Sequence, residues 1–186
     1  KMTTFEIPTV TTERLRLRRI SMQDAEHMYA YASDEEVAKY VTWETHRSIN
    51  DSKKFIQFIL VQYAKHDIAP WGIELKESGR LVGTVDFVWW KPEQQSAEIG
   101  YVLARDCWGQ GLMMEAASAL LKLGFGEMDL VRIQARCIEG NIGSQRVMEK
   151  IGMTYEGTLR KGIKIKGQHW DLKLYSILKE EFESAH

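Results

Sequence analysis

The period of the apolar residues changes from segment to segment along this chain. Positions 14–20 alternate between basic and apolar side chains, which is typical of a strand with one face in solvent. Residues 49–65 instead place Phe55, Ile59 and Tyr63 at intervals of four, the spacing of one helical face. Because segments of both kinds follow one another, the sequence predicts a sheet that is covered by helices.

The same patterns predict the remaining elements. The predicted strands are 14–20, 71–75, 81–89, 98–103, 131–138, 158–165 and 170–178. The predicted helices are 24–33, 49–65, 112–125 and 142–151. Gly79 suits the turn of the hairpin 71–89, and Gly152 suits a left-handed C-terminal cap. This order indicates an α/β or α+β fold with helices on both faces, and 186 residues suit a single domain.

Composition and charge narrow the function classes. Hydrophobic residues make up 44% and charged residues 27%, as in an ordinary globular protein. The formal net charge of −1 gives no reason to expect nucleic acid or an acidic membrane surface as a partner. The basic cluster at 14–19 is more simply the solvent face of the first strand.

Further sequence features suggest a cytoplasmic protein. No apolar run approaches the ~20 residues that span a bilayer, and residues 1–6 lack an export signal. Lys1, which precedes Met2, is interpreted as an added residue. Cys107 and Cys137 form no Cys-x-x-Cys motif, and neither has a histidine at the spacing of a metal ligand. We therefore expect two reduced thiols and no metal.

The most informative segment runs from Ile99 to Ala117, where a strand passes through Gly109-Gln110-Gly111 directly into a helix. Two glycines at such a junction expose backbone N–H groups, and the start of a helix favours a phosphate or pyrophosphate. The alternative is a tight turn that needs glycine for its geometry alone. A P-loop and a dinucleotide fold are disfavoured, because Leu112 follows the second glycine and Met114 occupies the third glycine position.

This segment resembles the acetyl-CoA-binding motif of the GNAT N-acetyltransferases, Gln/Arg-x-x-Gly-x-Gly/Ala, with one departure. The Gln/Arg position, three before Gly109, holds Asp106. Other matching pieces occur in the family's order and resemble the RimJ/RimL branch, which acetylates the N-termini of ribosomal proteins. They are Thr12-Glu-Arg-Leu-Arg-Leu-Arg18, Leu81-Val-Gly-Thr-Val85, Ala97-Glu-Ile-Gly-Tyr-Val-Leu103, Asn141-Ile-Gly-Ser144 and Glu149-Lys-Ile-Gly-Met153.

The resemblance implies a fold and a cosubstrate. It implies an acetyltransferase domain at 12–182, between an N-terminal extension at 1–11 and a tail at 183–186. Its sheet would be mixed but mostly antiparallel, with strands 98–103 and 131–138 splayed to admit the pantetheine arm of acetyl-CoA. The residues implied to hold the cosubstrate are Tyr101, Val102, Leu103, Trp108, Gly109, Gln110, Gly111, Leu112, Met113, Asn141 and Ser144.

Acetyl transfer to an amine needs a proton acceptor, an oxyanion donor and a proton for the departing thiolate. Ser144 is our candidate for the last role, with Asn141 as the N-cap of its helix. The alternative is that both residues only satisfy backbone groups at the helix start. Glu98 is the candidate base, acting directly or through water, because a carboxylate among apolar neighbours can have a raised pKa. It could equally be a surface residue at a strand end.

The remaining catalytic assignments are less specific. The resemblance implies an oxyanion donor among the backbone N–H groups near Tyr101–Leu103. Tyr101 is itself either a general acid or a packed aromatic. His46, Glu44 and His169 are rival bases.

Six tryptophans are many for this length, and most of them are expected in the core. We expect Trp43 and Trp170, together with His46 and His169, to frame the mouth of the acceptor site.

The leading hypothesis is an acetyl-CoA-dependent N-acetyltransferase that acts on a protein or peptide N-terminus by direct attack in a ternary complex. A small amine, such as an amino acid, polyamine or aminoglycoside, is the alternative acceptor. A non-catalytic acyl-CoA-binding module is the alternative from another class, and a purely structural interaction protein ranks last. The branch also suggests a homodimer.

Overall fold

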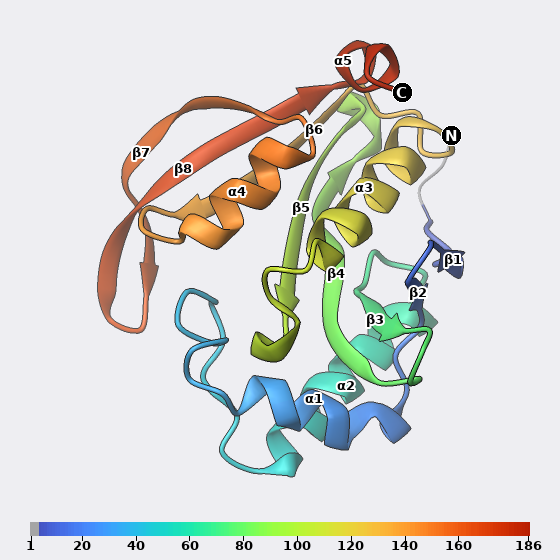
Figure 1. Ribbon diagram of the computed structural model, residues 1–186, viewed down its shortest axis with the longest axis vertical. Helices are drawn as coiled ribbons and strands as arrows, with labels where there is room; N and C mark the ends of the chain where they lie inside the picture. The colour runs from blue at the N-terminus through green and yellow to red at the C-terminus, as the bar shows by residue number, and fades with distance from the viewer. Residues whose placement is uncertain (1–3) are drawn as a thin grey trace.

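The computed structural model describes residues 4–186, and within them eight strands form one mixed sheet (Figure 1). The strand order is β1-β2-β3-β4-β5-β6-β8-β7, and every neighbouring pair except β5 and β6 is antiparallel. The strands are β1 (Val10–Thr11), β2 (Leu15–Arg18), β3 (Trp71–Leu75), β4 (Leu81–Lys91), β5 (Ser96–Leu103), β6 (Arg132–Ile138), β7 (Thr154–Ile165) and β8 (Gln168–Leu178).

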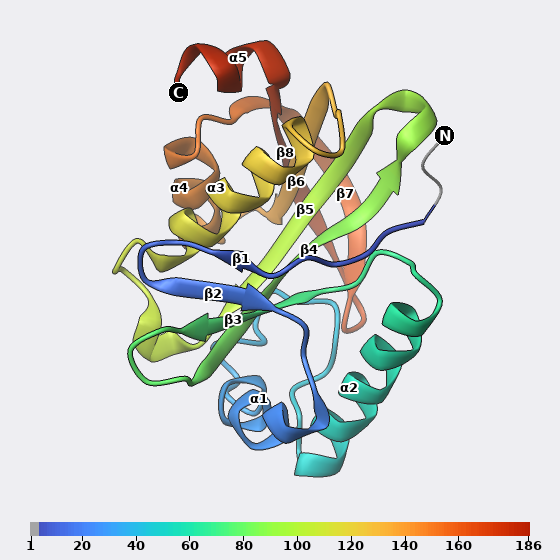
Figure 2. The ribbon, with the colours of Figure 1, turned by 90° about the vertical axis from the view of Figure 1, so that its right-hand side faces the viewer.

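Helices cover both faces of this sheet (Figure 2). The α-helices are α1 (Ala25–Ala32), α2 (Ile49–Ala64), α3 (Leu112–Phe125), α4 (Ile142–Lys150) and α5 (Lys179–Ser184). Short 3-10 turns occupy Met22–Asp24, Pro92–Gln94 and Arg105–Cys107. Helices α1 and α2 pack together on one face, while α3 and α4 lie on the other (Figure 2). None of the helices within residues 4–186 has the length and apolar character needed to span a membrane.

The fold class predicted from the sequence is confirmed, and each predicted helix and strand is present with small shifts of its ends. The strand predicted at 158–165 begins four residues earlier, at Thr154. Strand β1 and helix α5 were not predicted. Residues of the expected N-terminal extension join the fold: Phe5 is buried against Trp71, and Val10–Thr11 pair with β2. Lys1 lies outside the described residues.

The two central strands separate, as the resemblance implies. Strands β5 and β6 pair only between Ser96–Glu98 and Arg132–Gln134. Beyond this short ladder, residues 99–103 keep their pairing with β4, while residues 135–138 keep theirs with β8. The parallel strands therefore open into a gap towards the start of α3, which connects them.

The core fills the space between the sheet and the helices on both of its faces. Trp71 and Phe87 are almost fully buried, with ring centroids 5.9 Å apart. Met113, Ala117 and Leu120 are buried on α3, so this side of the helix faces the sheet. Burial of each large apolar side chain stabilises the fold by about 1.5–3 kcal/mol, and this burial holds α3 in position at the gap.

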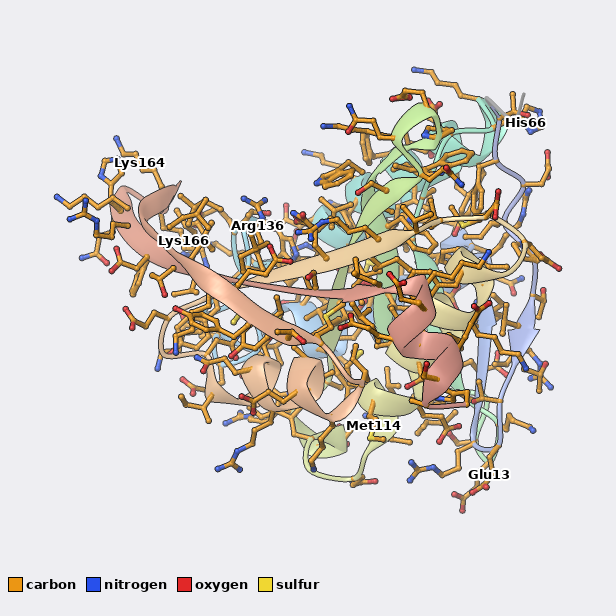
Figure 3. All side chains as sticks on the ribbon, turned by 90° about the horizontal axis from the view of Figure 1, so that it is seen from above. Glu13, His66, Met114, Arg136, Lys164 and Lys166 are labelled. Atoms are coloured by element: carbon orange, nitrogen blue, oxygen red, sulfur yellow. The ribbon has the colours of Figure 1, made fainter. Side chains whose placement is uncertain are left out.

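The hairpin β7–β8 extends beyond the rest of the sheet and meets the loop at residues 33–48. Figure 3 shows Lys164 and Lys166 towards its far end, with Arg136 nearer the centre of the molecule. The Lys166 Nζ donates to the Ala38 carbonyl at 2.6 Å. The rings of Tyr40 and Trp170 meet edge to face at 6.5 Å. These contacts fix the loop against the hairpin.

Candidate active site

The loop before α3 presents a row of unpaired backbone donors. Gly109 and Gly111 have φ angles of +75° and +76°, in the left-handed region that favours glycine. A Cβ built at Gly109 meets no atom within 4 Å, so the loop is open there. Within residues 4–186, no backbone N–H from Gly109 to Met114 donates a hydrogen bond. Such a helix start fits a pyrophosphate group.

Charged side chains form ion pairs that support this loop. Arg14 forms an ion pair with Glu115 at 2.8 Å and donates from Nη1 to the Gln110 carbonyl at 2.9 Å. Asp106, the departure from the family motif, accepts from Arg80 at 2.7 Å, and this hydrogen bond lowers the pKa of Asp106. Asp106 therefore supports the loop through its contact with Arg80. The unpaired donors of the loop are the backbone N–H groups from Gly109 to Met114.

Strand β5 offers two backbone N–H groups to the gap. The Ala104 N–H donates to the Val82 carbonyl at 2.7 Å, and antiparallel ladder bonds recur at every second residue. Val102, opposite Thr84, therefore uses its N–H in the ladder with β4. The N–H groups of Tyr101 and Leu103 point the other way, into the gap. The sequence left open which N–H group near Tyr101–Leu103 would be the oxyanion donor. This alternation leaves the N–H groups of Tyr101 and Leu103 as the candidates.

Tyr101 and Ser144 meet across the gap on the α4 side. The Tyr101 hydroxyl lies 3.0 Å from Ser144 Oγ and donates to the Ser144 carbonyl at 3.2 Å. Asn141 Oδ1 accepts from the Ser144 N–H at 3.3 Å, so Asn141 is the predicted N-cap. Burial raises the pKa of Tyr101 well above its usual range. Its phenol therefore stays protonated at neutral pH and can donate.

Cys137 lies beside this pair, and its thiol is not activated. It is buried on β6, and its burial raises the pKa of the thiol to about 11, although a hydrogen bond with Ser144 opposes that change. A thiol in this state is neutral at physiological pH. Cys107 is also buried, and both cysteines are free.

Glu98 lies on the opposite face of β5 from Tyr101, because side chains alternate along a strand. It is 4% exposed. Its carboxylate accepts from Trp89 at 3.3 Å, from Gln134 at 2.8 Å and from Arg136, which approaches to 3.0 Å. From the sequence we expected apolar neighbours for this carboxylate, whereas the structure surrounds it with hydrogen-bond donors.

A second carboxylate, which we did not predict from the sequence, lies on this face. Asp86 lies on β4 directly opposite Gly100 of β5, two residues along from Glu98. Burial and the negative charge of Glu98 raise the pKa of Asp86 to about 7. One signal was present in the sequence, since Asp86 is the only charged residue within the predicted strand 81–89.

An aromatic cavity lies beside these carboxylates, between the sheet and α1–α2. Two of the predicted acceptor residues line it, Trp43 and His46. His46 Nδ1 is 2.8 Å from Ser52 Oγ, and burial lowers the pKa of this histidine, which is therefore neutral at physiological pH. The other lining residues are Met28, Tyr31, Ala32, Phe55, Thr84 and Val102.

The other predicted residues lie in two places, on β8 and at the glycine loop before α3. Trp170 and His169 lie on β8, where Trp170 contacts Tyr40 of the loop that carries Trp43 and His46. Trp108 is 48% exposed beside the glycine loop, and its Nε1 donates to the Leu103 carbonyl at 2.8 Å. The side chains of Leu112 and Met113 are buried, so only their backbone groups face the loop.

Within residues 4–186, no cluster of three or more His, Cys, Asp or Glu side chains is arranged to hold a metal ion.

Comparisons with known proteins agree with this geometry. The sequence profile of the GNAT acetyltransferase domain matches residues 14–154. The uncharacterized N-acetyltransferase YoaA of Bacillus subtilis is 35% identical over 92% of this chain and 97% of its own length. A crystal structure of a GNAT-family acetyltransferase from Bacillus anthracis is 36% identical, with a TM-score of 0.82 over 93% of this chain and 99% of that one.

A structure of RimL, a ribosomal alpha-N-protein acetyltransferase in complex with coenzyme A, has the same fold. Its TM-score is 0.80 over 92% of this chain and 98% of that one, at 20% identity. At this identity the likeness concerns the fold alone.

Proposed function

This chain belongs to the GNAT family of acetyltransferases, which take their acetyl group from acetyl-CoA, and from that premise we propose a protein or peptide N-terminus as its acceptor. The chain is an acetyl-CoA-dependent N-acetyltransferase. In the proposed reaction, the neutral α-amine attacks the thioester carbon directly while both substrates are bound. The C–N bond forms, the C–S bond breaks, and CoA leaves as the thiol.

The observation that carries this proposal is the gap between β5 and β6 with the start of α3 at its mouth. Six successive N–H groups, from Gly109 to Met114, have no acceptor within residues 4–186, and they suit the pyrophosphate of acetyl-CoA. The pantetheine arm would then run along residues 101–103, where alternate N–H groups face the gap. The residues present therefore fit the cosubstrate.

The Tyr101–Ser144 pair is our proposed proton source for the departing thiolate. Support comes from its place on the gap and from the 3.0 Å contact between the two hydroxyl oxygens. A hydroxyl that stays protonated can donate to a thiolate as the charge develops. The N–H of Tyr101 or Leu103 would stabilise the oxyanion. The Asn141 side chain fixes Ser144 through the helix cap.

Glu98, together with a water molecule, remains a candidate for receiving the amine proton. Its support is position, since it is on the acceptor face of β5 next to the gap. Its hydrogen bonds with Gln134 and Arg136 leave it few free lone pairs, which makes direct contact with an amine difficult. Asp86 is the other carboxylate on this face.

An N-terminal amine is the favoured acceptor because its pKa of ~8 leaves less proton removal to the enzyme than a lysine amine at ~10.4. The order of motifs resembling the RimJ/RimL branch also supports it. A small amine is the second candidate, and the observation favouring it is the small aromatic cavity lined by Trp43 and His46.

Release of CoA thiol from acetyl-CoA tests this proposal, with N-terminal peptides and small amines offered separately. We expect turnover with peptides and a fall in kcat of about 10- to 100-fold in Ser144→Ala, with acetyl-CoA affinity within about threefold of wild type. Ser184→Ala, at an exposed position of α5, is the matched control. Turnover of small amines alone would contradict the peptide acceptor, and wild-type kcat in Ser144→Ala would remove Ser144 from the mechanism.

A further inference from the structure

Asp86 is a carboxylate without a cation. It projects from β4, and no side chain or backbone N–H within residues 4–186 donates a hydrogen bond to it. The side chain is partly buried, so the missing donor is not replaced by full exposure to solvent. A carboxylate in such a place is stabilised when a cationic group approaches it.

The groups around Asp86 leave this position open for a ligand. Gly100 of β5 lies directly opposite, and a Cβ there would be only 3.3 Å from Asp86 Oδ1. Any side chain at Gly100 would therefore crowd the carboxylate. The charged or titratable groups on this face are Glu98 on β5, Arg136 on β6, and Tyr31 and His46 in the cavity wall. Arg136 is already held by Glu98.

Asp86 also lies one step along the sheet from the aromatic cavity. Thr84 and Val102 form the cavity floor and pair with each other, and Asp86 and Gly100 are the next pair on the same face. The cavity volume is only ≈ 20 Å³, so it admits a small apolar group. A ligand that places such a group beside Trp43 and Phe55 would bring its polar end towards Asp86.

We propose that Asp86 binds the ammonium group of the acceptor and takes the proton that must leave before attack, and that the acceptor carries an apolar group next to its amine. This inference rests on the proposed acetyl transfer and deepens it. It assigns the acceptor to primary amines with a small apolar substituent, such as an N-terminal alanine or a short alkylamine.

The acceptor nitrogen loses two protons, one before the attack and one after it. The ammonium transfers one proton to the Asp86 carboxylate, which becomes a carboxylic acid and later releases it to solvent. The neutral amine then attacks the thioester carbon, the C–N bond forms and the C–S bond breaks. The second proton lost by the nitrogen passes to solvent water, while the thiolate receives a proton from the Tyr101–Ser144 pair, which regains one from solvent.

In this account Glu98 is a positioning residue. Its oxygens are occupied by Trp89, Gln134 and Arg136, whereas Asp86 has no such donors. The Glu98 charge raises the pKa of Asp86. A carboxylate with a pKa near the working pH is an efficient base, and two carboxylates in different environments divide their roles in this way.

The pH profile of kcat/KM tests the assignment with Asp86→Asn, Glu98→Gln and, as a matched control, Asp67→Asn at an exposed position before β3. In wild type we expect an acidic limb near the Asp86 pKa of about 7. Asp86→Asn should lose at least about 100-fold and follow the pKa of the amine instead, with unchanged acetyl-CoA affinity. Glu98→Gln should move the acidic limb of the remaining activity to lower pH, because the Glu98 charge raises the pKa of Asp86. Loss of activity in Glu98→Gln, with the limb intact in Asp86→Asn, would overturn the proposal.

A binding measurement separates this proposal from the proposed function. Calorimetry of propylammonium binding to the CoA-bound protein requires no turnover. We expect binding to wild type and to Asp67→Asn, and at least about tenfold weaker binding to Asp86→Asn. Equal affinity in Asp86→Asn would overturn the ammonium site even if acetyl transfer occurs. If wild type released no CoA with any amine, acetyl transfer to these acceptors would fail, and the binding result would still decide the role of Asp86.

Discussion

Tyr101 and Ser144 come from two elements, and their single hydroxyl contact couples them at the gap. If they supply one proton together, removing either hydroxyl should have nearly the same effect as removing both. We therefore expect Tyr101→Phe, Ser144→Ala and the double variant to lower kcat to a similar extent, about 10- to 100-fold. Single-turnover acetylation measures this loss, with Tyr29→Phe at the surface as the control. Additive losses would show that the two residues act separately.

Asp86 also makes the stability of the fold depend on pH. Because its pKa in the folded protein, about 7, exceeds its usual value of 3.8, the folded state binds this proton more tightly than the unfolded state. Its contribution to stability is therefore present below about pH 4 and is lost as the pH rises through 7. We expect Asp86→Asn to gain stability relative to wild type between pH 5 and pH 8, as measured by urea unfolding. A constant difference across this range would contradict the raised pKa.

Individual site residues were predictable where the local sequence determines their role. Asn141 was predicted as an N-cap because its type and place at a helix start suffice. The environment of Glu98 was not predictable, since Gln134 and Arg136 reach it from a strand distant in sequence. Asp86 was missed for a related reason. Its importance depends on facing Gly100 and Glu98, and neither the pairing register nor the missing donor is visible in its own segment.

At the scale of elements, the loop before α3 needs its glycines for backbone shape. Gly111 has a φ of +76°, and its N–H is one of the unpaired donors. An alanine there would cost roughly 1–2 kcal/mol of backbone strain, which the loop can relieve by turning its donors away. We expect Gly111→Ala to weaken acetyl-CoA binding at least about tenfold in calorimetry.

A matched control separates this local effect from backbone strain in general. Gly167, in the turn of the β7–β8 hairpin, has a φ of +82° and open space around it. Gly167→Ala should carry similar strain and leave acetyl-CoA affinity unchanged. Equal affinities for wild type and Gly111→Ala would contradict the role of this loop.

Elements with a clear apolar period were predicted well, and those without one were missed. Helix α3 was predicted at its observed bounds because its apolar face repeats through four turns. Helix α5 is short and acidic, and it forms partly because the Glu181 carboxylate accepts from the Leu178 N–H at 2.9 Å. The start of β7 was missed because its first residues are mostly exposed and show no alternation.

On the scale of the whole molecule, the hairpin β7–β8 supports the loop that carries Trp43 and His46. The Tyr40–Trp170 contact and the Lys166–Ala38 hydrogen bond join them. Removing the Trp170 ring should free this loop, so Trp170→Ala should raise the KM of the acceptor and speed hydrogen exchange at residues 34–48. The affinity for acetyl-CoA should not change, since its proposed site lies at α3. An unchanged exchange rate would show that the hairpin does not hold the loop.

The overall topology was within reach of the sequence only through the resemblance. The alternation of elements predicts a sheet with helices on both faces, but strand order and the parallel pair β5–β6 depend on contacts between distant segments. The ordered set of short motifs supplied that information. The separation of these two strands joins the helix start, the Tyr101–Ser144 pair and the carboxylates into one site.

The most direct test of the central claim is to locate the transferred acetyl group. Wild-type protein, acetyl-CoA and a peptide with an N-terminal alanine would be incubated, and the product sequenced by tandem mass spectrometry. We expect one acetyl group on the α-nitrogen of the first residue for each CoA thiol released. CoA release without an acetylated peptide, or acetylation of lysine side chains alone, would contradict it.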